Sequence, residues 1–155
     1  MARYFDRLPP KARLLDGGCG LGEFVVHLTR KGFLTIGLDI SRKTVEELRR
    51  LFPDMSFEAG DIRATGLPDS SVDGYFSWGT FEHFEAGLEP CMTEALRILQ
   101  PGGLLFITVP FDNLRHALRA ASDWRGTATP PVLPARFYQW RLTRGELRDT
   151  LARCG

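Results

Sequence analysis

The chain has 155 residues, of which 43% are hydrophobic and 25% are charged, and its formal net charge is +1. This is the composition of an ordinary globular protein, and the length fits a single domain spanning residues 1–155. The sequence has no low-complexity segment, no run of 18 apolar residues and no apolar signal-peptide core at its N-terminus. We therefore expect a cytoplasmic protein without a membrane partner.

Cysteine and arginine positions narrow the range of partners. Cys19, Cys91 and Cys154 are widely spaced and form no Cys-x-x-Cys pair, so the sequence predicts neither a disulfide framework nor a metal site. Residues 113–155 carry eight arginines and three acidic residues, which suits either an anionic partner or a solvated surface. The arginines are not interleaved with aromatic residues in one block. This favours the solvated surface and no nucleic-acid partner.

Apolar runs and helical patterns alternate along most of the chain. Helices are predicted at residues 24–31, 44–52 and 89–99. Such alternation builds a parallel sheet with right-handed crossovers, whose ligands bind at the carboxyl ends of the strands. The strands are predicted at residues 12–16, 34–39, 55–59, 72–78 and 104–109.

Two of these helices have predicted inward faces. The helix at 44–52 starts with a capping box formed by Thr44 and Glu47, and the helix at 89–99 turns Leu96 and Leu99 inward. The apolar face of the helix at 44–52 comprises Val45, Leu48, Leu51 and Phe52.

The pattern is weaker after the fifth strand. Residues 113–121 predict a short helix, and residues 122–134, which contain three prolines, predict a loop. Thr143 and Glu146 form a second capping box, which predicts a last helix through Leu151.

A glycine-rich segment follows the first predicted strand. Gly18, Gly20 and Gly22 stand at alternate positions just before a helix, where glycine permits a positive φ and lets bare backbone approach a ligand. Asp39 ends the next strand, where an acidic side chain can bind ribose hydroxyls, and Asp61 follows the third strand. The pattern predicts an adenosine derivative as ligand.

The glycine spacing separates two classes of such ligands. A dinucleotide fold places its third glycine one position later, where this chain has Glu23. That carboxylate would face two phosphate charges in a low dielectric, which is strongly unfavourable. A ligand without phosphates is therefore favoured over NAD.

Residues 14–22, Leu-Leu-Asp-Gly-Gly-Cys-Gly-Leu-Gly, together with Asp39 and Asp61, resemble the class I S-adenosylmethionine-dependent methyltransferases, in the group that methylates small molecules. The resemblance extends from residue 14 to residue 155. It implies a Rossmann-like sheet of strand order 3-2-1-4-5, with S-adenosylmethionine as cofactor and S-adenosylhomocysteine as product. The family's strands six and seven have no counterpart here. We therefore expect a C-terminally incomplete domain and a homodimer through the exposed edge of strand five.

The resemblance also implies roles for residues at the strand ends. In the glycine loop, Gly17 departs from the family, which has a larger apolar residue there, and we expect this to loosen the loop. The carbonyl of Gly18 would accept a hydrogen bond from the ammonium group of the cofactor. The loop residues expected around the methionine moiety and ribose are Asp16, Gly18, Cys19, Gly20 and Gly22.

The two later acids bind the other end of the cofactor in this interpretation. Asp39 would accept from two ribose hydroxyls, and Asp61 would accept from the exocyclic amine of adenine. Further cofactor contacts are expected from Ile40, Ile62, Ser77 and Trp78.

The segment after the fourth strand ends in a Glu-His pair that is frequent in the family. His83 is the catalytic candidate, because an imidazole with an unperturbed pKa of about 6.5 can take a proton from an acceptor oxygen or nitrogen at neutral pH. The alternative is that its ring only braces the loop. Two places are open for Trp78, Phe81 and Phe84: they line the mouth of the site, or they pack in the core, as aromatic clusters more often do.

These observations predict S-adenosylmethionine-dependent methyl transfer to a small-molecule acceptor, at oxygen, nitrogen or carbon. Transfer from a sulfonium is a direct displacement, so alignment and desolvation can serve it without a protein nucleophile. The alternative from another class is a non-catalytic cofactor-binding or assembly module. An NAD-dependent oxidoreductase is less favoured.

Overall fold

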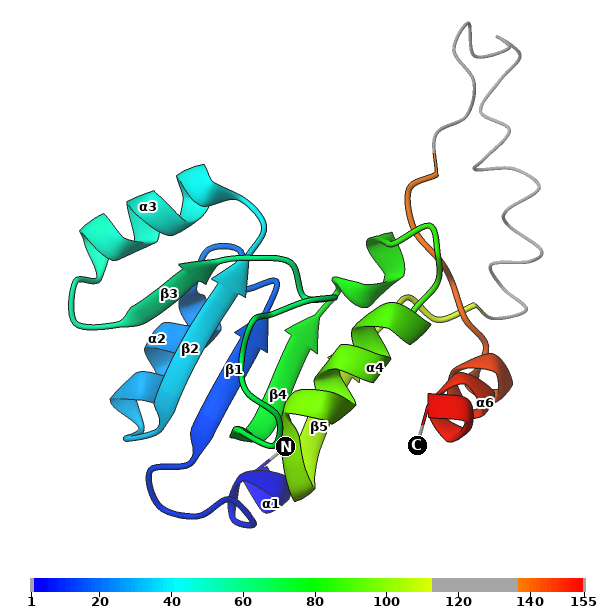
Figure 1. Ribbon diagram of the computed structural model, residues 1–155, viewed down its shortest axis with the longest axis horizontal. Coiled ribbons are helices and arrows are strands. Elements are labelled where there is room, and N and C mark those ends of the chain that lie inside the picture. The colour runs from blue at the N-terminus through cyan, green and yellow to red at the C-terminus, as the bar shows by residue number, and fades with distance from the viewer. Residues whose placement is uncertain (1, 113–136, 155) are drawn as a thin grey trace, which may run out of the picture.

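The computed structural model describes residues 2–112 and 137–154. Five parallel strands form one sheet in the order β3-β2-β1-β4-β5 (Figure 1), which confirms the fold class and the strand order predicted from the sequence. The helix predicted at residues 113–121 and the loop at residues 122–134 lie outside the described residues. The strands are β1 (Arg13–Gly17), β2 (Leu34–Asp39), β3 (Ser56–Ala59), β4 (Val72–Trp78) and β5 (Leu99–Thr108).

Helices cover both faces of this sheet. In Figure 1, α4 lies in front of the strands and α2 lies behind them. α3 shares the α2 side, because Val45 and Leu48 of α3 pack with Val25 of α2, and α6 packs beside α4. The helices are α1 (Ala2–Phe5), α2 (Glu23–Arg30), α3 (Arg42–Leu51), the 3-10 turn η1 (Phe81–His83), α4 (Glu89–Ile98) and α6 (Arg144–Cys154).

Alternation along the central strands assigns side chains to the two layers. Leu14 and Phe76 pack toward α2, whereas Leu15 and Tyr75 pack toward α4. All four are fully buried, as expected for strands of a parallel sheet covered on both faces. The same alternation brings Asp16, the next residue of β1 on the α2 side, to the carboxyl end of the sheet.

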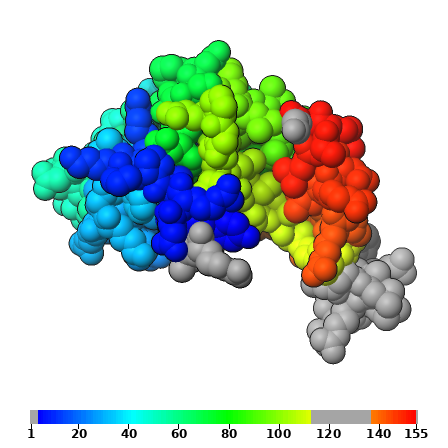
Figure 2. Space-filling model, turned by 90° about the horizontal axis from the view of Figure 1, so that it is seen from below, coloured from blue at the N-terminus to red at the C-terminus, as the bar shows by residue number. Residues whose placement is uncertain are grey.

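The amino end of the sheet is partly covered by the N-terminal segment, seen in blue in Figure 2. The ring of Phe5 stacks on Phe76, with centroids 5.6 Å apart, and Phe76 stacks on Phe106 at 4.9 Å. Stacked rings of this kind bury large apolar areas, so α1 is anchored across β4 and β5.

The start of α3 differs from the prediction. Ser41 is the N-cap: its Oγ accepts from Thr44 N at 3.2 Å, and the helix begins at Arg42. With Ser41 as the cap, Glu47 lies a full turn inside the helix, where its carboxylate bonds to Arg50 on the exposed surface. The capping box formed by Thr44 and Glu47 was therefore a wrong prediction.

Two predicted apolar faces are also corrected. Leu51 is 51% exposed, so α3 rests on Val45 and Leu48 instead. Leu96 is 38% exposed, and Leu99 belongs to β5, which starts five residues earlier than predicted. The inward series of α4 follows helical spacing from its own first turn and consists of Cys91, Met92, Glu94, Ala95 and Ile98.

The cap of α6 is confirmed. Thr143 N and Thr143 Oγ1 both donate to Glu146 Oε2 at 2.8 Å, and Glu146 N donates back to Thr143 Oγ1 at 3.2 Å. α6 has 11 residues, whereas a bilayer crossing takes about 20. In the part of the chain that the structure describes, no helix is long and apolar enough to cross a membrane.

Candidate cofactor and acceptor site

The glycine loop joins the end of β1 to the start of α2, and hydrogen bonds fix it to the end of β2. Gly18 N and Cys19 N both donate to Leu38 O, at 2.8 and 3.0 Å. Gly20 N donates to Asp39 Oδ2 at 3.0 Å. The loop is thus held at the carboxyl edge of the central strands, where this class of fold binds its ligands.

The three alternate glycines all have a positive φ, but their surroundings differ. A Cβ on Gly18 would overlap the Thr80 side chain, and a Cβ on Gly22 would approach Leu48 within 2.9 Å. A Cβ on Gly20 would meet no atom within 4 Å. Gly18 and Gly22 are therefore required by packing as well as by backbone conformation, while the space in front of Gly20 is open.

Gly17 has a different role from the one expected. Its φ is not positive, and a Cβ at this position would overlap the ring of Tyr75 on β4. Gly17 does not loosen the loop, because the buried Tyr75 ring fills the volume that a larger residue would take. Burial raises the pKa of Tyr75, and its hydroxyl has no hydrogen-bond partner.

Cys19 contributes its backbone rather than its thiol. Its side chain is 8% exposed and packs against Val25, Val45, Leu48 and Phe57. Burial, with smaller effects of Asp16 and Asp39, raises the pKa of the Cys19 thiol to about 12. The thiol therefore stays protonated at neutral pH and is no nucleophile.

A hollow of about 330 Å³ opens between the glycine loop, the start of α2 and the end of β4. Phe24 and Trp78 form part of its wall, with Asp16 and the loop backbone. Two buried polar atoms of these residues, Asp16 Oδ1 and Trp78 Nε1, have no hydrogen-bond partner among residues 2–112 and 137–154. Since buried polar groups are nearly always paired, an acceptor and a donor left unpaired beside one hollow indicate a ligand site.

The carboxyl group of Asp16 is strongly perturbed. Its side chain is 2% exposed, and burial, followed by the negative charge of Asp39, raises the pKa of Asp16 to about 7. A cation beside Asp16 would favour the ionised form and lower this pKa. The hollow is therefore suited to a positively charged ligand group.

Asp39 connects the glycine loop to the start of α3. Its Oδ1 accepts from Ser41 N at 2.9 Å, while its Oδ2 accepts from Gly20 N. Each carboxylate oxygen has a further lone pair, so the side chain can still accept from two hydroxyl groups. Ile40, the next residue, is 70% exposed and offers apolar surface beside this carboxylate.

Asp61 lies at the same edge of the sheet, since Gly60 N donates to Asp39 O at 2.9 Å. Its carboxylate is paired with Arg63, a partner that the sequence reasoning did not include. Arg63 Nη2 lies 2.6 Å from Asp61 Oδ2, and this bond lowers the pKa of Asp61. Ile62 is 3% exposed and packs in the core on the α4 side.

At the end of β4, the predicted residues separate into core and rim. Ser77 Oγ is buried and donates to Gly17 O at 2.7 Å, so it braces β4 against β1. Phe81 is 1% exposed and packs on Tyr75, so of the two places considered for it the structure shows the core. Phe84 is half-buried, with the Arg63 guanidinium 4.6 Å from its ring centroid.

His83 is exposed on η1, and its ring is tied outward. His83 Nδ1 lies 2.9 Å from Tyr138 O, and since a carbonyl only accepts, Nδ1 carries the hydrogen in this contact. Nε2 then remains as the free acceptor of the neutral ring. The bracing role considered for His83 is thus present in the structure, and a proton-accepting nitrogen remains beside it.

The turn is held from outside by residues 137–142, which we call the strap. Trp140 N donates to Glu82 O at 2.8 Å, and Trp140 Nε1 donates to Phe84 O at 2.9 Å. Sequence reasoning missed Glu82, which is 3% exposed and whose Oε2 has no partner among the residues that the structure describes. The available signal was an acidic residue followed by a histidine, with an aromatic residue on each side of the pair, in the segment Phe81-Glu82-His83-Phe84.

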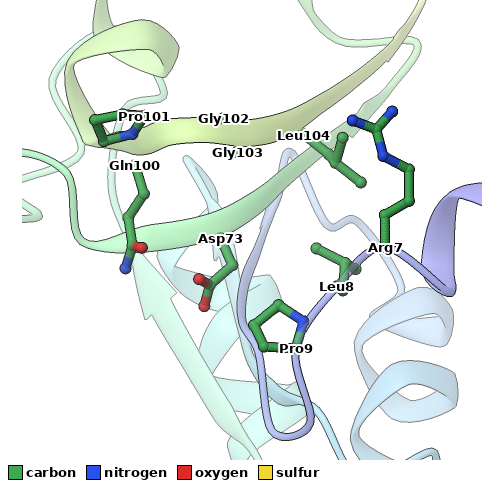
Figure 3. Close-up of a pocket in the computed structure, with 9 residues that line it drawn as sticks. All are labelled: Arg7, Leu8, Pro9, Asp73, Gln100, Pro101, Gly102, Gly103 and Leu104. Carbon is green, nitrogen blue, oxygen red and sulfur yellow. The ribbon is translucent and has the colours of Figure 1, made fainter.

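A second hollow, of about 120 Å³, lies at the opposite end of β4 and β5 (Figure 3). Arg7, Asp73 and Gln100 supply its polar side chains, and Asp73 Oδ2 already accepts from Arg13 N at 2.8 Å. The amino ends of parallel strands are not where such folds bind ligands. The candidate site is therefore placed at the carboxyl ends.

Comparisons with known proteins identify the family. The family model of the methyltransferase domain matches residues 15–107. A malonyl-[acyl-carrier protein] O-methyltransferase from Methylococcus capsulatus is 36% identical over 126 residues, which is 75% of this chain and 45% of the relative. A 2-methyl-6-phytyl-1,4-hydroquinone methyltransferase from Synechocystis is 33% identical over 106 residues, which is 66% of this chain and 33% of the relative. The chain thus spans less than half the length of these curated relatives.

The fold comparison agrees with the family model. The crystal structure of a methyltransferase dependent on S-adenosylmethionine from Methanosarcina mazei matches with a TM-score of 0.81 and 20% identity, covering 99% of this chain and 84% of that one. The residues matched by the family model include the glycine loop, both acids that follow it and the end of β4. The resemblance seen in the sequence is thereby confirmed, and the chain belongs to the methyltransferase domain family, whose cofactor is S-adenosylmethionine.

Proposed function

We propose that the protein transfers the methyl group of S-adenosylmethionine to a small-molecule acceptor, with the cofactor lying across the carboxyl ends of β1, β2 and β3. The observation that carries this proposal is the hollow beside the glycine loop. Asp16 and Trp78 both line this hollow, and in the described part of the chain each keeps a buried polar atom unpaired, a carboxylate oxygen and the indole N–H. The amino-acid end of the cofactor carries an ammonium group and a carboxylate, which complement this donor and acceptor.

The rest of the cofactor would follow the strand ends. Asp39, already fixed by Gly20 N and Ser41 N, holds the ribose hydroxyls, with Ile40 beside them. Asp61 and the backbone N–H of Ile62 hold the adenine. In this arrangement the adenine amine shares Asp61 with Arg63, so the base binds at the rim of the crevice.

Methyl transfer from a sulfonium requires mainly that the protein aligns the two reactants and excludes water from them. When bound, S-adenosylmethionine supplies an electrophilic methyl group on a sulfonium. The rigid loop and the end of β4 hold this group, and the aromatic residues around the mouth exclude water from it. His83 Nε2, on the exposed η1 turn, is one candidate proton acceptor.

The predictions of cellular location, acceptor class and oligomeric state made from the sequence remain part of the proposal. Two of the three cysteines are buried and all three are free, which suits a reducing compartment such as the cytoplasm. A small-molecule acceptor rather than nucleic acid is proposed from the family relatives. Within residues 2–112 and 137–154, β5 is an edge strand of the sheet, and this edge is where a homodimer would form.

Calorimetric titration tests the cofactor site. S-adenosylmethionine and S-adenosylhomocysteine should bind, and Trp78→Phe or Asp16→Asn should weaken both by about 1 to 3 kcal/mol, the range for a lost hydrogen bond to a charged group. 5′-Methylthioadenosine lacks the amino-acid end, so its affinity should not change. Asp73→Asn, in the second hollow, is the matched control and should leave all three affinities unchanged.

Turnover is tested by release of S-adenosylhomocysteine with a panel of phenols, amines and carboxylic acids. Methylation of at least one acceptor supports the proposed transfer. Cofactor binding without turnover of any acceptor would favour the non-catalytic module, and binding of NADH in place of S-adenosylmethionine would favour an oxidoreductase.

A further inference from the structure

Glu82 is a buried carboxyl group whose charge the described residues do not pair. Glu82 is 3% exposed, and its Oε2 is buried and has no hydrogen-bond partner in the described part of the chain. Leaving a buried acceptor unpaired costs about 1 to 3 kcal/mol. A stable fold tolerates such a group mainly where a ligand or a reaction uses it.

The position of Glu82 relates it to the end of β4. Gly79, between β4 and η1, has a φ of +64°, and a Cβ on Gly79 would stand 3.4 Å from Glu82 Oε1. The carboxyl group therefore turns back from η1 toward Gly79, the residue after Trp78. Trp78 itself lines the hollow of the glycine loop, so the Glu82 carboxyl group lies next to the residue that follows the wall of the proposed cofactor site.

The strap is hydrogen-bonded to the turn that carries this carboxyl group. Trp140 N donates to Glu82 O, Trp140 Nε1 donates to Phe84 O, and His83 Nδ1 bonds to Tyr138 O. These bonds hold the backbone of the turn and the His83 ring and do not involve the Glu82 carboxyl group. A reactive group whose supporting residues are bonded in this way is held in one orientation.

The electrostatics of the turn favour Glu82 over His83 as a base. Burial raises the pKa of Glu82, while a hydrogen bond from its own backbone N–H and, by a smaller amount, the charge of the neighbouring His83 lower the pKa. A carboxyl group of raised pKa is closer to the basicity that proton transfer at neutral pH requires. His83 is exposed and its ring is tied outward.

We propose that Glu82 accepts the proton of the methyl acceptor, which is therefore a small molecule that presents an O–H or N–H group. This inference rests on the proposed methyl transfer. The acceptor donates its hydrogen bond to Glu82 while its lone pair forms the bond to the methyl carbon. The carbon–sulfur bond breaks, its electron pair stays on sulfur, and the proton moves to Glu82. Water takes that proton when the methylated product leaves, and charge balances because the sulfonium has become a neutral thioether.

The test compares Glu82→Gln with wild type in the release of S-adenosylhomocysteine, using the best phenol, amine or carboxylic acid of the panel. We expect kcat to fall by roughly 100-fold or more, as for loss of a general base. The affinity for S-adenosylmethionine should stay within about twofold of wild type, since Glu82 is not one of the proposed cofactor residues.

The pH profile and two further variants separate this role from a structural one. Wild-type kcat should rise as the pH passes upward through the pKa of Glu82, because only the ionised form accepts a proton, and Glu82→Gln should lack this limb. Glu82→Asp should recover part of kcat, and Glu85→Gln, at an exposed neighbour, should match wild type. Wild-type kcat and an unchanged acid limb in Glu82→Gln would overturn the proposal.

A titration of the carboxyl group makes the result independent of finding an acceptor. In protein labelled with ¹³C-glutamate and saturated with S-adenosylhomocysteine, the Glu82 resonance, assigned with Glu82→Gln, should titrate above the ordinary glutamate range. Titration within that range would overturn the proposal even if no acceptor is turned over. Failure of the protein to bind the cofactor would instead contradict the proposed function.

Discussion

Two groups of buried polar side chains differ in how completely their polar atoms are hydrogen-bonded. On α4, Glu94 accepts from Thr65 N, from Thr65 Oγ1 and from Arg97, which pins the segment between β3 and β4 to the helix. At the strand ends, Asp16, Trp78 and Glu82 each keep a buried polar atom without a partner. Arg97 and Thr65 hold the pKa of Glu94 at about 2, whereas burial raises that of Asp16 to about 7. The carboxylate of Glu94 is thus fully used in hydrogen bonds within the fold, whereas three of the unpaired buried atoms of the described residues belong to side chains near the proposed ligand site.

Breaking the paired group should have the largest effect on stability. Glu94→Ala should lower the free energy of unfolding by about 3 kcal/mol at neutral pH, because Thr65 N and Arg97 lose a buried acceptor. The folded-state pKa is lowered from 4.5 to about 2, so the stabilisation is present above pH 4.5 and is lost as the pH falls toward 2. Urea denaturation at several pH values measures this, and a loss that persists unchanged at about pH 2 would contradict it.

Replacing the unpaired Asp16 should raise the stability of the protein rather than lower it. The pKa of Asp16 is raised from 3.8 to about 7, so its contribution to stability is fully present below pH 3.8 and is lost as the pH rises through 7. Asp16→Asn removes this loss and should be more stable than wild type at about pH 8, by about 1.4 kcal/mol for each unit by which the pKa is raised. Near pH 4 the two should be alike. Thermal unfolding at both pH values checks this, and destabilisation at the higher pH would show that Asp16 is a structural residue.

The glycine loop offers a matched pair of variants. Gly18→Ala introduces both a strained φ and an overlap with Thr80, so we expect a loss of about 2 kcal/mol in unfolding free energy. Gly20→Ala has open space and only the backbone strain, for which about 1 kcal/mol is expected. Both should weaken cofactor binding, Gly20→Ala by occupying the proposed ligand space. Equal stability of the two variants would mean that Thr80 moves aside without cost.

A surface ion pair should matter least. Glu47 and Arg50 on α3 are bonded at 2.6 Å, with side chains that are 55% and 67% exposed. Exposed pairs are screened by solvent, so Glu47→Ala should leave the urea midpoint and the cofactor affinity at their wild-type values. A clear drop in the midpoint would indicate that Glu47 does act in the cap of α3.

The sequence predicted the sheet well because its signals are local. Apolar runs marked each strand, and the acids at 39 and 61 were placed at the carboxyl edge by the alternation of strands and helices. The cap of α3 was missed because Ser41 and Thr44 both qualify, and only the length of the turn after β2 selects Ser41. The predicted cofactor residues lie at one edge of the sheet, and their contacts with the cofactor remain proposals.

The rest of the site depends on contacts between distant segments, which no local pattern contains. The ring of Tyr75 on β4 leaves no room for a side chain at Gly17 of β1, although the two residues are far apart in the sequence. The burial of an unpaired Glu82 depends on the conformation of η1 and on its contacts with the strap, which a local sequence pattern does not specify. Phe81 fits either the mouth or the core by residue type, and the inward rotation of η1 decides for the core.

A crystal structure of the protein with S-adenosylhomocysteine is the most direct test of the unpaired atoms as a ligand site. It should show the ammonium nitrogen within hydrogen-bond distance of Asp16 Oδ1 and a carboxylate oxygen within the same distance of Trp78 Nε1. An empty hollow at saturating ligand, or an amino-acid end bound away from both atoms, would contradict the account.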